Sequence, residues 1–364
     1  MTDWLDTTLR KNVIIEKVSP NDVDEVIGIL EGVDRSSSSI ECGYYTDTRT
    51  SGSLTVVGDS YERFQFLRPI VEVPEIGYRR ELGLYLVWND PASKPASEWV
   101  YDLELQSMLH TLSTSMSGRL WTLATNSKAM TAARQMLSKC GRQYVITGND
   151  YVFKSLKAFD ANTSWLSRLY GLAEASGNRI DVDGHGRITI QRYVEPSAKT
   201  PKMTLNIDDP RGVIQSIGMS SNELSMPNQV VVRCAYSETV NGKTVNKEVV
   251  GQADLKGGLS AATRGYTVTN YVEESDMSPR TVAKANQLAA ERLRRDTAGI
   301  VEWEIETPYL PLWEGDVVSL LVSDGPSGHT NARKCLVKSI DMELLHCGMT
   351  IGLKEVTEKD YGEE

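Results

Sequence analysis

Asp181 and Asp183 are the residues of this sequence whose types and spacing come nearest to metal chemistry. Both precede a glycine-rich turn at 184–186, and closely spaced aspartates before such a turn can supply oxygen ligands to calcium. The segment lacks the later glutamate that a helix-loop-helix calcium loop requires, and Ile180 and Val182 alternate with the aspartates as in a strand. A hairpin turn is therefore the favoured interpretation, and an ion on Asp181 and Asp183 stays an open alternative.

The remaining residues with catalytic potential form no recognisable motif. The four histidines lie far apart and none belongs to an H-E-x-x-H pair: His110, His185, His329 and His346. No nucleophile elbow, phosphate-binding loop or dinucleotide-binding glycine motif occurs, and Asp208-Asp209-Pro210 is more typical of a turn than of an acid pair. The sequence therefore predicts no catalytic residue, no cofactor and no enzyme.

The cysteines favour buried thiols over disulfides or a zinc site. There are five of them, an odd number, and no C-x-x-C pair occurs. They are Cys42, Cys140, Cys234, Cys335 and Cys347. We expect them to be reduced.

Composition and charge restrict the possible partners. The chain has 364 residues, 40% of them hydrophobic and 24% charged, which is typical of a folded protein with more than one domain. Its formal net charge is −10, so a general attraction for phosphate backbones or anionic membranes is not expected. No secretion signal and no apolar segment of membrane-spanning length occurs. We expect neither sequence-specific nucleic-acid binding nor a membrane span.

Short apolar groups separated by turn residues dominate the first part of the chain. Examples are 54–57 (LTVV) and 81–88 (ELGLYLVW), while 97–112 alternates between apolar and polar residues. Such groups predict β-strands joined by tight turns. Residues 1–115 are therefore expected to form a first β-barrel module.

Residues 116–200 are expected to form a mixed α/β insertion. Apolar residues recur at helical spacing in 126–140 and in 163–176, and Gly141 and Gly177 suit the left-handed position that ends a helix. The second helix leads into a hairpin predicted at 179–191.

The last part of the chain is again strand-like. Residues 201–275 are expected to form a β-rich module, and 276–364 a helix followed by the strands that complete a second barrel. The helix carries a basic run at 291–295, which is more typical of a solvated helix end than of a site for an anionic partner. The predicted class is α+β, mainly β, with two tube-like β-barrel modules and a mixed α/β insertion between them. Sequence identity between the two barrel modules is too weak to indicate a repeat.

Several segments, taken in order, resemble phage tail hub proteins, the central hubs of tails and baseplates. They are SGSLTVV (51–57), ELGLYLV (81–87), the helix and hairpin ending in GNRIDVDGHGRITI (177–190), PNQVVV (227–232), ANQLAAERL (285–293) and YLPLWEGDVVSL (309–320). Each segment alone is ordinary strand, turn or helix sequence. Their order extends over roughly 40–355, which is most of the chain.

The resemblance implies a structural virion protein. In such hubs each chain carries two tube-like barrels, so that a homotrimer adapts a sixfold tail tube to a threefold tip and lets DNA pass. Implied partners are a distal tail or tail-tube ring above, a spike, fibre or lysin below, and a tape measure protein in the channel. The implied location is the phage tail, assembled in the host cytoplasm. The 309–320 segment would then begin a wall strand, with Val317, Val318, Leu320 and Leu321 filling the barrel and the subunit seam.

Two alternatives remain open from the sequence. Within the same class, the chain could be a distal tail ring or a spike base of a contractile secretion system. From another class, it could be a cell-wall carbohydrate-acting enzyme or binding module, favoured by the β-rich pattern and by Trp88, Trp99 and Trp313. Core or interface packing is the more ordinary role for those tryptophans.

Overall fold

The computed structural model describes most of the chain. The described residues are 4, 6, 8–58, 61, 65–95, 98–116, 118–209, 211, 214, 216–221, 225–240, 243–274, 277, 279–297, 301–323 and 330–356.

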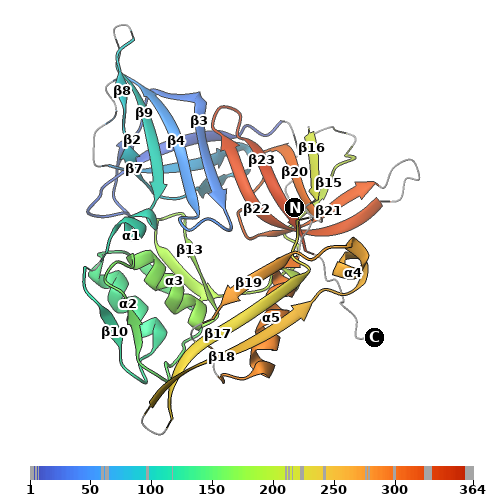
Figure 1. Ribbon diagram of the computed structural model, residues 1–364. Helices are drawn as coiled ribbons and strands as arrows, with labels where there is room; N and C mark the ends of the chain where they lie inside the picture. The colour runs from blue at the N-terminus through green and yellow to red at the C-terminus, as the bar shows by residue number, and fades with distance from the viewer. Residues whose placement is uncertain are drawn as a thin grey trace.

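A 15-stranded sheet dominates the fold and takes strands from both ends of the chain (Figure 1). Its early strands are β1 (Asn12–Val18), β2 (Val26–Ile29), β3 (Val33–Gly43), β4 (Thr50–Val57), β5 (Phe66–Val73), β6 (Tyr78–Glu81), β7 (Tyr85–Asn89), β8 (Ala92–Ser93) and β9 (Val100–Ser107). Its late strands are β15 (Thr204–Asn206), β16 (Ser216–Ser221), β20 (Val301–Pro308), β21 (Val317–Ser323), β22 (Thr330–Glu343) and β23 (Gly348–Glu355). The main path is β16-β20-β23-β22-β3-β4-β9-β7-β5-β1-β2.

Eight consecutive strands of this path form two units with the same topology. The first unit has the order β7-β9-β4-β3 and the second has the order β22-β23-β20-β16. In both, the order in the sheet is the third, fourth, second and first strand of the unit along the chain. Every neighbouring pair is antiparallel, including the β3–β22 pair that joins the units. The repeat that the sequence does not reveal is thus present in the topology.

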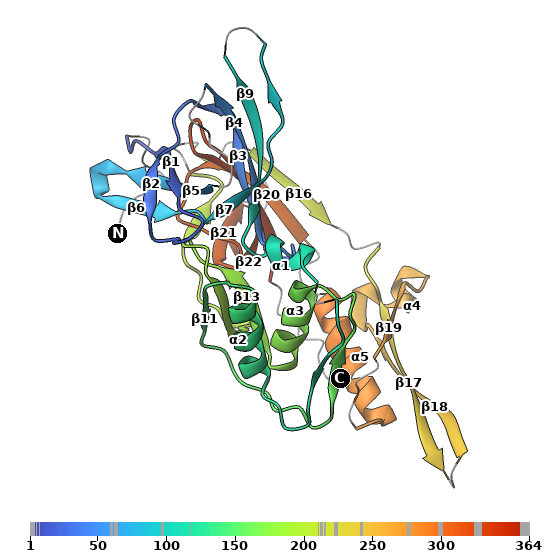
Figure 2. The same ribbon diagram turned by 90° about the vertical axis from the view of Figure 1, so that its left-hand side faces the viewer.

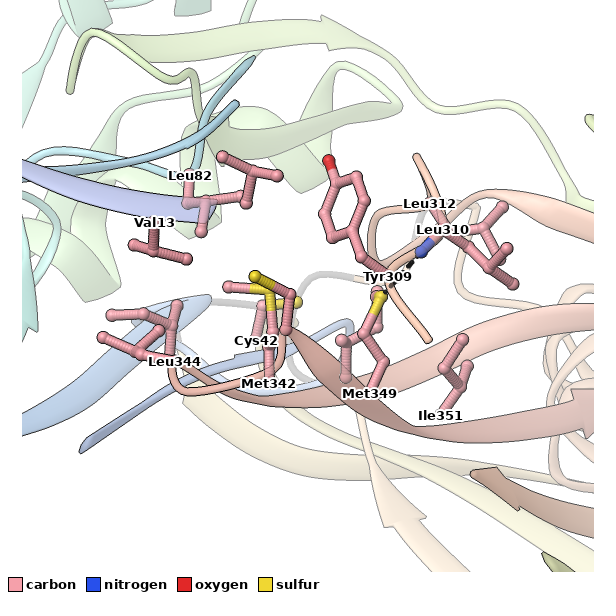
Figure 3. Close-up of a cluster of buried hydrophobic side chains, with 14 of the residues drawn as sticks. Val13, Cys42, Leu82, Tyr309, Leu310, Leu312, Met342, Leu344, Met349 and Ile351 are labelled. Atoms are coloured by element: carbon pink, nitrogen blue, oxygen red, sulfur yellow. Dashed lines mark hydrogen bonds between the residues drawn. The ribbon is translucent and has the colours of Figure 1, made fainter. Parts of the chain in front are cut away.

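One hydrophobic core serves both units. Figure 3 shows Val13 and Leu82 from the first part of the chain near Met342 and Met349 from the last part. The backbone amide of Leu310 donates a hydrogen bond to the Met349 sulfur at 3.1 Å. The predicted mainly β, α+β class is confirmed, and the two barrel modules form one continuous sheet rather than separate bodies.

The segment YLPLWEGDVVSL leads into β21, an interior strand paired with β15 on one side and β22 on the other. Val318 and Leu320 are buried in the shared core, and Val317 packs against Tyr44 and Leu336. Because β21 has a partner on both sides, it does not lie at an edge of the sheet. Val317, Val318 and Leu320 are thus buried, whereas Leu321 is only half-buried. Their expected part in a subunit seam stays a prediction.

The mixed insertion lies below the sheet in Figure 1 and has its own core. Its elements are α1 (His110–Thr114), β10 (Trp121–Leu123), α2 (Ala129–Lys139), β11 (Tyr144–Ile146), β12 (Lys157–Phe159), α3 (Trp165–Ala175), β13 (Asn178–Val182) and β14 (Ile188–Arg192). The helices occupy the segments in which the helical spacing was seen, and β13 and β14 form an antiparallel hairpin.

The N-terminal ends of α2 and α3 are capped in different ways. Ser164 caps α3 by accepting a hydrogen bond from the amide of Ser167 at 3.1 Å. At α2 the N-cap position is held by Lys128, whose side chain makes no capping hydrogen bond; the Asp150 carboxylate accepts from the amide of Met130 at 3.0 Å instead. The cap of α2 therefore comes from a residue distant in sequence.

A smaller sheet with one helix forms the third body. It contains β17 (Gln229–Val240), β18 (Lys243–Asp254), β19 (Thr269–Glu273), α4 (Ala261–Arg264) and α5 (Val282–Thr297). Short 3-10 helices elsewhere are η1 (Pro74–Ile76), η2 (Pro196–Ala198) and η3 (Gly257–Leu259). Figure 2 shows the β17–β18 hairpin projecting away from the large sheet.

Helix α5 packs on β17 and β18. Ala289 and Leu293 contact Val230 and Val232, and a Cβ on Gly251 would come within 2.3 Å of the α5 backbone. Strands β15 and β16, in contrast, join the large sheet. Elements on both sides of residue 275 thus share a core, and the domain division at 115, 200 and 275 stays a prediction.

Candidate functional site

The solvent-facing side of the two four-strand units is strongly acidic, and we refer to it as the acidic face. It carries the carboxylates of Glu41 (β3), Asp102 and Glu104 (β9), Glu302, Glu304 and Glu306 (β20), and Asp341 and Glu343 (β22). All are exposed except Glu302, which is half-buried. The acidic face extends without a break across the β3–β22 junction.

Strand alternation places these carboxylates together. Residues 301–306 (VEWEIE) direct Trp303 and Ile305 into the core and the glutamates to the opposite side, because successive side chains of a strand point to opposite faces. The same alternation occurs in β9 and in residues 340–343 (IDME) of β22. Acidic residues at every second position of a half-buried strand are the sequence signal that could have revealed this face.

Small side chains fill the space between the carboxylates. One register row across the sheet runs through Ser51, Glu41, Asp341, Thr350 and Glu306. Other positions of the face are serine, threonine or glycine, among them Ser39, Ser53, Thr55, Gly218, Ser220, Ser339 and Gly352. An open depression of about 460 Å³ lies in the middle of the face, at the junction of the units. The middle of the face is thus acidic and rich in small and hydroxyl side chains.

Cations compensate only a small part of this charge. Lys338 forms an ion pair with Glu302 at 2.7 Å, and Lys354 lies opposite Glu302 in register. In the part of the chain that the structure describes, Glu41, Asp341 and Glu304 have no ion-pair partner. Glu41 lies directly opposite Asp341, an arrangement of like charges that destabilises a sheet. Partial burial also raises the pKa of Asp341. The carboxylates of the acidic face are therefore present although their repulsion costs stability. The negative field of the acidic face repels polyanions.

A second charged group, the polar joint, connects the insertion to the β3–β4 turn and to the turn before β21. It consists of Tyr44, Arg49, Arg179, Asp181 and Glu314. Arg179 donates through Nε to both Asp181 oxygens, at 2.8 and 2.7 Å, and its guanidinium lies 3.7 Å from the centre of the Tyr44 ring. Arg49 lies 3.5 Å from Asp181 and donates to the Ile180 carbonyl at 3.1 Å. These contacts tie the hairpin β13–β14 to the β3–β4 turn.

Glu314 is the buried end of the polar joint. Its Oε1 lies 4.0 Å from Arg179 Nη2, and its Oε2 is buried without a hydrogen-bond partner among the described residues. Burial, and secondarily the charge of Asp181, raises the pKa of Glu314 to about 8. The next residue, Gly315, has φ of +83°, and a Cβ there would lie 2.9 Å from the Tyr44 ring. The Glu-Gly-Asp turn before β21 is therefore a packing element of this joint.

The two aspartates considered as ion ligands are used otherwise. Asp181 belongs to the polar joint. Asp183 accepts hydrogen bonds from the amides of His185 and Arg187 at 3.0 and 2.9 Å and pairs with the Arg187 side chain at 2.7 Å. Within the described residues no group of three or more His, Cys, Asp or Glu side chains could hold a metal ion.

The remaining candidate residues are dispersed. Asp209 accepts from the side chain and amide of Arg211, which lowers its pKa to about 2; Pro210 and His329 lie outside the described residues. His110 packs against Trp88, His185 lies near Glu81, and His346 is exposed. In the 291–295 run, Arg292, Arg294 and Arg295 are on the exposed side of the α5 C-terminal end, and Arg292 pairs with Asp296.

Most of the cysteines are buried, whereas the three candidate tryptophans are at least partly exposed. Cys42, Cys234, Cys335 and Cys347 are buried thiols, and Cys140 is half-buried. Trp88 and Trp99 are 50% and 40% exposed, and Trp313 is partly buried beneath the Arg80 guanidinium at 5.2 Å.

In the described part of the chain, no helix is long and apolar enough to span a membrane.

Comparison with known proteins identifies the fold. No family model and no curated protein matches the sequence. Among solved structures, a tail protein from Neisseria meningitidis superposes with a TM-score of 0.67 at 10% identity, covering 97% of this chain and 98% of that chain. The 43 kDa tail protein of prophage MuSo2 from Shewanella oneidensis gives 0.63 at 13% identity, covering 94% and 98%.

A third structure extends the comparison to secretion systems. An Escherichia coli protein, described as a type VI secretion component similar to the T4 bacteriophage tail proteins gp27 and gp5, gives a TM-score of 0.51 at 11% identity, covering 90% of this chain and 76% of that chain. The resemblance seen in the sequence is confirmed at the level of the fold: this chain has the fold of phage tail proteins along nearly its whole length.

Proposed function

We propose that this chain is the hub of a phage tail or baseplate, a structural protein in which three copies close into a ring between a sixfold tail tube and a threefold tip. The observation that carries the proposal is the acidic face, which spans two units of identical topology in one chain. Three chains would supply six such units, and six units match a sixfold tube. The fold shared with phage tail proteins supports the same assignment.

The acidic face would line the central passage of the ring. DNA that slides through a channel must not bind its wall, because each phosphate contact with a cation adds affinity. A wall of carboxylates and small hydroxyl side chains offers repulsion and hydrogen-bonding water in place of such contacts. The unpaired charges of Glu41, Glu304 and Asp341 then have a function that offsets their cost in stability.

The proposed neighbours follow from this position. A distal tail or tail-tube ring would bind above, and a spike, fibre or lysin protein below. A tape measure protein would occupy the passage before DNA ejection. The chain would act in the virion after assembly in the host cytoplasm, and it would catalyse no reaction itself.

A contractile secretion system is the second candidate. The Escherichia coli structure described as a type VI secretion component shares the fold, which favours a spike base in such a system. A spike base has no DNA to pass, so an acidic passage is the feature that favours the phage hub. A wall-acting enzyme or binding module stays an alternative from the sequence alone.

The first test measures the size and shape of the purified protein. Light scattering should give three times the mass of the chain, and negatively stained particles should show a ring with a central opening. Particles with six copies would contradict the hub in favour of an ordinary tube or distal ring. A compact monomer at every concentration tested would contradict self-assembly into a hub.

The second test addresses the acidic face. Replacing Glu41, Glu304 and Asp341 together by lysine should create measurable binding to double-stranded DNA, which the wild-type ring lacks, in a fluorescence anisotropy titration at low salt. The control variant, with the same net charge, replaces Glu25, Glu174 and Asp208, which are exposed elsewhere. Equal DNA binding by both variants would contradict a special role of the acidic face.

A further inference from the structure

We propose that the polar joint is a pH-sensitive contact, which holds the mixed insertion against the large sheet in acidic and neutral solution and opens in mildly alkaline solution. This movement takes place within one chain and does not rest on the proposed ring. The two bodies would move apart along the polar joint while each keeps its own core.

The insertion and the large sheet have separate hydrophobic cores. Figure 1 shows the insertion below the sheet, and in the part of the chain that the structure describes no hydrophobic cluster joins residues 116–200 to a strand of the large sheet. Polar contacts connect the two bodies instead. The Tyr170 hydroxyl donates to the Asp47 carbonyl at 2.7 Å, and Lys199 Nζ donates to the Gly315 carbonyl at 2.7 Å. Separating the bodies would therefore break polar contacts rather than a core.

The β13–β14 hairpin touches the large sheet at two places. The first is the polar joint, to which the hairpin contributes Arg179 and Asp181. The second is the turn of the hairpin, where a Cβ on Gly184 would lie 2.9 Å from the Glu81 side chain and a Cβ on Gly186 would lie 2.6 Å from Leu84. The hairpin is therefore the element that an opening of the joint would lift from the sheet.

Glu314 lies in the polar joint in surroundings that favour its protonated form. Its Oε2 is buried without a hydrogen-bond partner among the described residues, and Arg179 Nη2 lies 4.0 Å from Oε1, beyond hydrogen-bond distance. Arg179 donates to both oxygens of Asp181 instead. An ionised carboxylate with so few donors is costly in a buried place, and burial raises the pKa of Glu314 to about 8. In the closed joint Glu314 is therefore neutral at pH 7.

The groups around Glu314 come from several elements. Its titratable and charged neighbours are Cys42, Tyr44 and Arg49 from β3 and the turn after it, Tyr85 from β7, Arg179 and Asp181 from β13, and Lys199 after η2. Burial raises the pKa values of the Cys42 thiol and the Tyr85 phenol, so neither is charged when Glu314 loses its proton. Burial also lowers the pKa of Lys199. Glu314 is thus the carboxyl group of this joint whose charge changes near pH 8.

Loss of the Glu314 proton favours an open joint. The ionised carboxylate would be repelled by Asp181 and would lack a donor at Oε2, and both costs fall when the hairpin moves away and water reaches Glu314. In water the carboxyl returns to its ordinary pKa of 4.5, so the open joint has released a proton that the closed joint holds. The equilibrium constant for opening should therefore rise by up to tenfold for each pH unit between about 4.5 and about 8.

The turn of the hairpin adds a second contact that acid strengthens. His185 Nε2 lies 3.6 Å from a carboxylate oxygen of Glu81, and His185 Nδ1 lies 3.9 Å from a carboxylate oxygen of Asp24. Within the hairpin itself, Asp183 is paired with Arg187. A protonated imidazole would be attracted to the two carboxylates of the sheet side, whereas a neutral imidazole is not. Both contacts of the hairpin therefore weaken as the pH rises.

Infrared spectroscopy tests whether Glu314 carries a proton. At pH 7 the wild-type protein should show the carbonyl stretch of a protonated carboxyl group, and this band should disappear between pH 7 and 9. The band should be absent from Glu314→Gln at pH 7. The control variant Glu343→Gln, which changes an exposed carboxylate, should keep it. A wild-type spectrum without the band at pH 7 would overturn the inference.

Pulsed electron paramagnetic resonance between two spin labels tests the opening itself. The labels are attached through Glu174→Cys in α3 and Ser53→Cys in β4, both exposed positions, and Cys140→Ser removes the half-buried native thiol. Labelled chains are diluted with unlabelled chains, so that the distance within one chain is measured. One distance is expected at pH 5, and a second distance should appear at pH 9. At pH 9 Glu314→Gln should keep the distance of pH 5, and Glu343→Gln should behave as the wild type.

Each outcome of the distance measurement decides the inference. The same distances at pH 5 and pH 9 in the wild-type protein would show that the joint does not open. An equal change in the wild type and in Glu314→Gln would assign the opening to other groups. His185→Gln should keep the change between pH 7 and 9, because it removes only the contact at the turn of the hairpin. None of these results bears on the proposed hub, which the size and shape of the particles test separately.

Discussion

The polar joint and the acidic face use charged residues in opposite ways. In the polar joint Arg179 is bound to Asp181, so that opposite charges meet in a largely buried place beside the protonated Glu314. On the acidic face Glu41 lies directly opposite Asp341 in solvent, without a cation on either among the described residues. Paired buried charges hold three parts of the chain in one geometry. Unpaired like charges contribute no such stability, and in the proposed hub they would serve to repel DNA in the passage.

The polar joint and the acidic face also differ in how their residues could be recognised in the sequence. Asp181 attracts attention because of its spacing to Asp183, yet its partners show a structural role. Glu41, Glu304 and Asp341 have no motif, and only their common face makes them a site. Substitutions that change one charge at a time test the difference between the polar joint and the acidic face.

The largest effect is expected at the centre of the polar joint. Arg179→Met should lower the free energy of unfolding by about 3–5 kcal/mol, because it leaves the Asp181 carboxylate buried with fewer partners. Denaturant unfolding followed by tryptophan fluorescence measures this. Arg187→Met removes an exposed ion pair with Asp183 from the same hairpin and should cost about 0–1 kcal/mol. An equal decrease in the free energy of unfolding for both variants would show that the polar joint contributes no more stability than the exposed Arg187–Asp183 pair.

A pH-dependent effect is expected at the buried end of the joint. The folded state raises the pKa of Glu314 from 4.5 to about 8, so the native protein holds a proton that the unfolded chain releases between these values. This contribution stabilises the fold at low pH and is lost as pH rises through that window. The stability of Glu314→Gln relative to wild type should therefore increase from about pH 4.5 to 8 and then level off.

The control for Glu314 is Glu343→Gln, which changes an exposed carboxylate of the acidic face in the same way. Parallel stability profiles of Glu314→Gln and wild type across pH 4–9 would contradict the protonated, buried state.

The smallest effect is a gain in stability on the acidic face. Asp341→Asn removes the like charge opposite Glu41 and should stabilise the fold by about 0.2–1 kcal/mol at neutral pH. Because burial raises the pKa of Asp341, its charged form costs stability above that pKa, and the gain should vanish as pH falls and the carboxyl protonates.

Asp102→Asn is the matched control, since Asp102 accepts a hydrogen bond from the Thr55 hydroxyl at 3.0 Å and has no carboxylate opposite it. It should give no gain. A loss of stability in Asp341→Asn at neutral pH would contradict the view that the acidic face is kept at a cost.

Local patterns were sufficient for the class of the fold. Alternation and turn residues predict the strands, and helical spacing with Gly141 and Gly177 at positive φ predicts the ends of α2 and α3. The cap of α2 was missed because Asp150 reaches it through the tertiary fold. The acidic face was missed because alternation shows which residues share the face of one strand, whereas neighbouring strands come from distant segments.

The mainly β class, the positions of the main helices and the hairpin at Asp183 follow from the sequence alone, since each depends on residues near one another in the chain. The resemblance to tail hubs follows from the order of such segments along the chain. The tertiary structure was needed to show that α5 covers β17 and β18, that two four-strand units share one topology, and that Glu41 faces Asp341 across β3 and β22. The physical reason is that strand order and register are fixed by side-chain packing between distant segments, which no local pattern specifies.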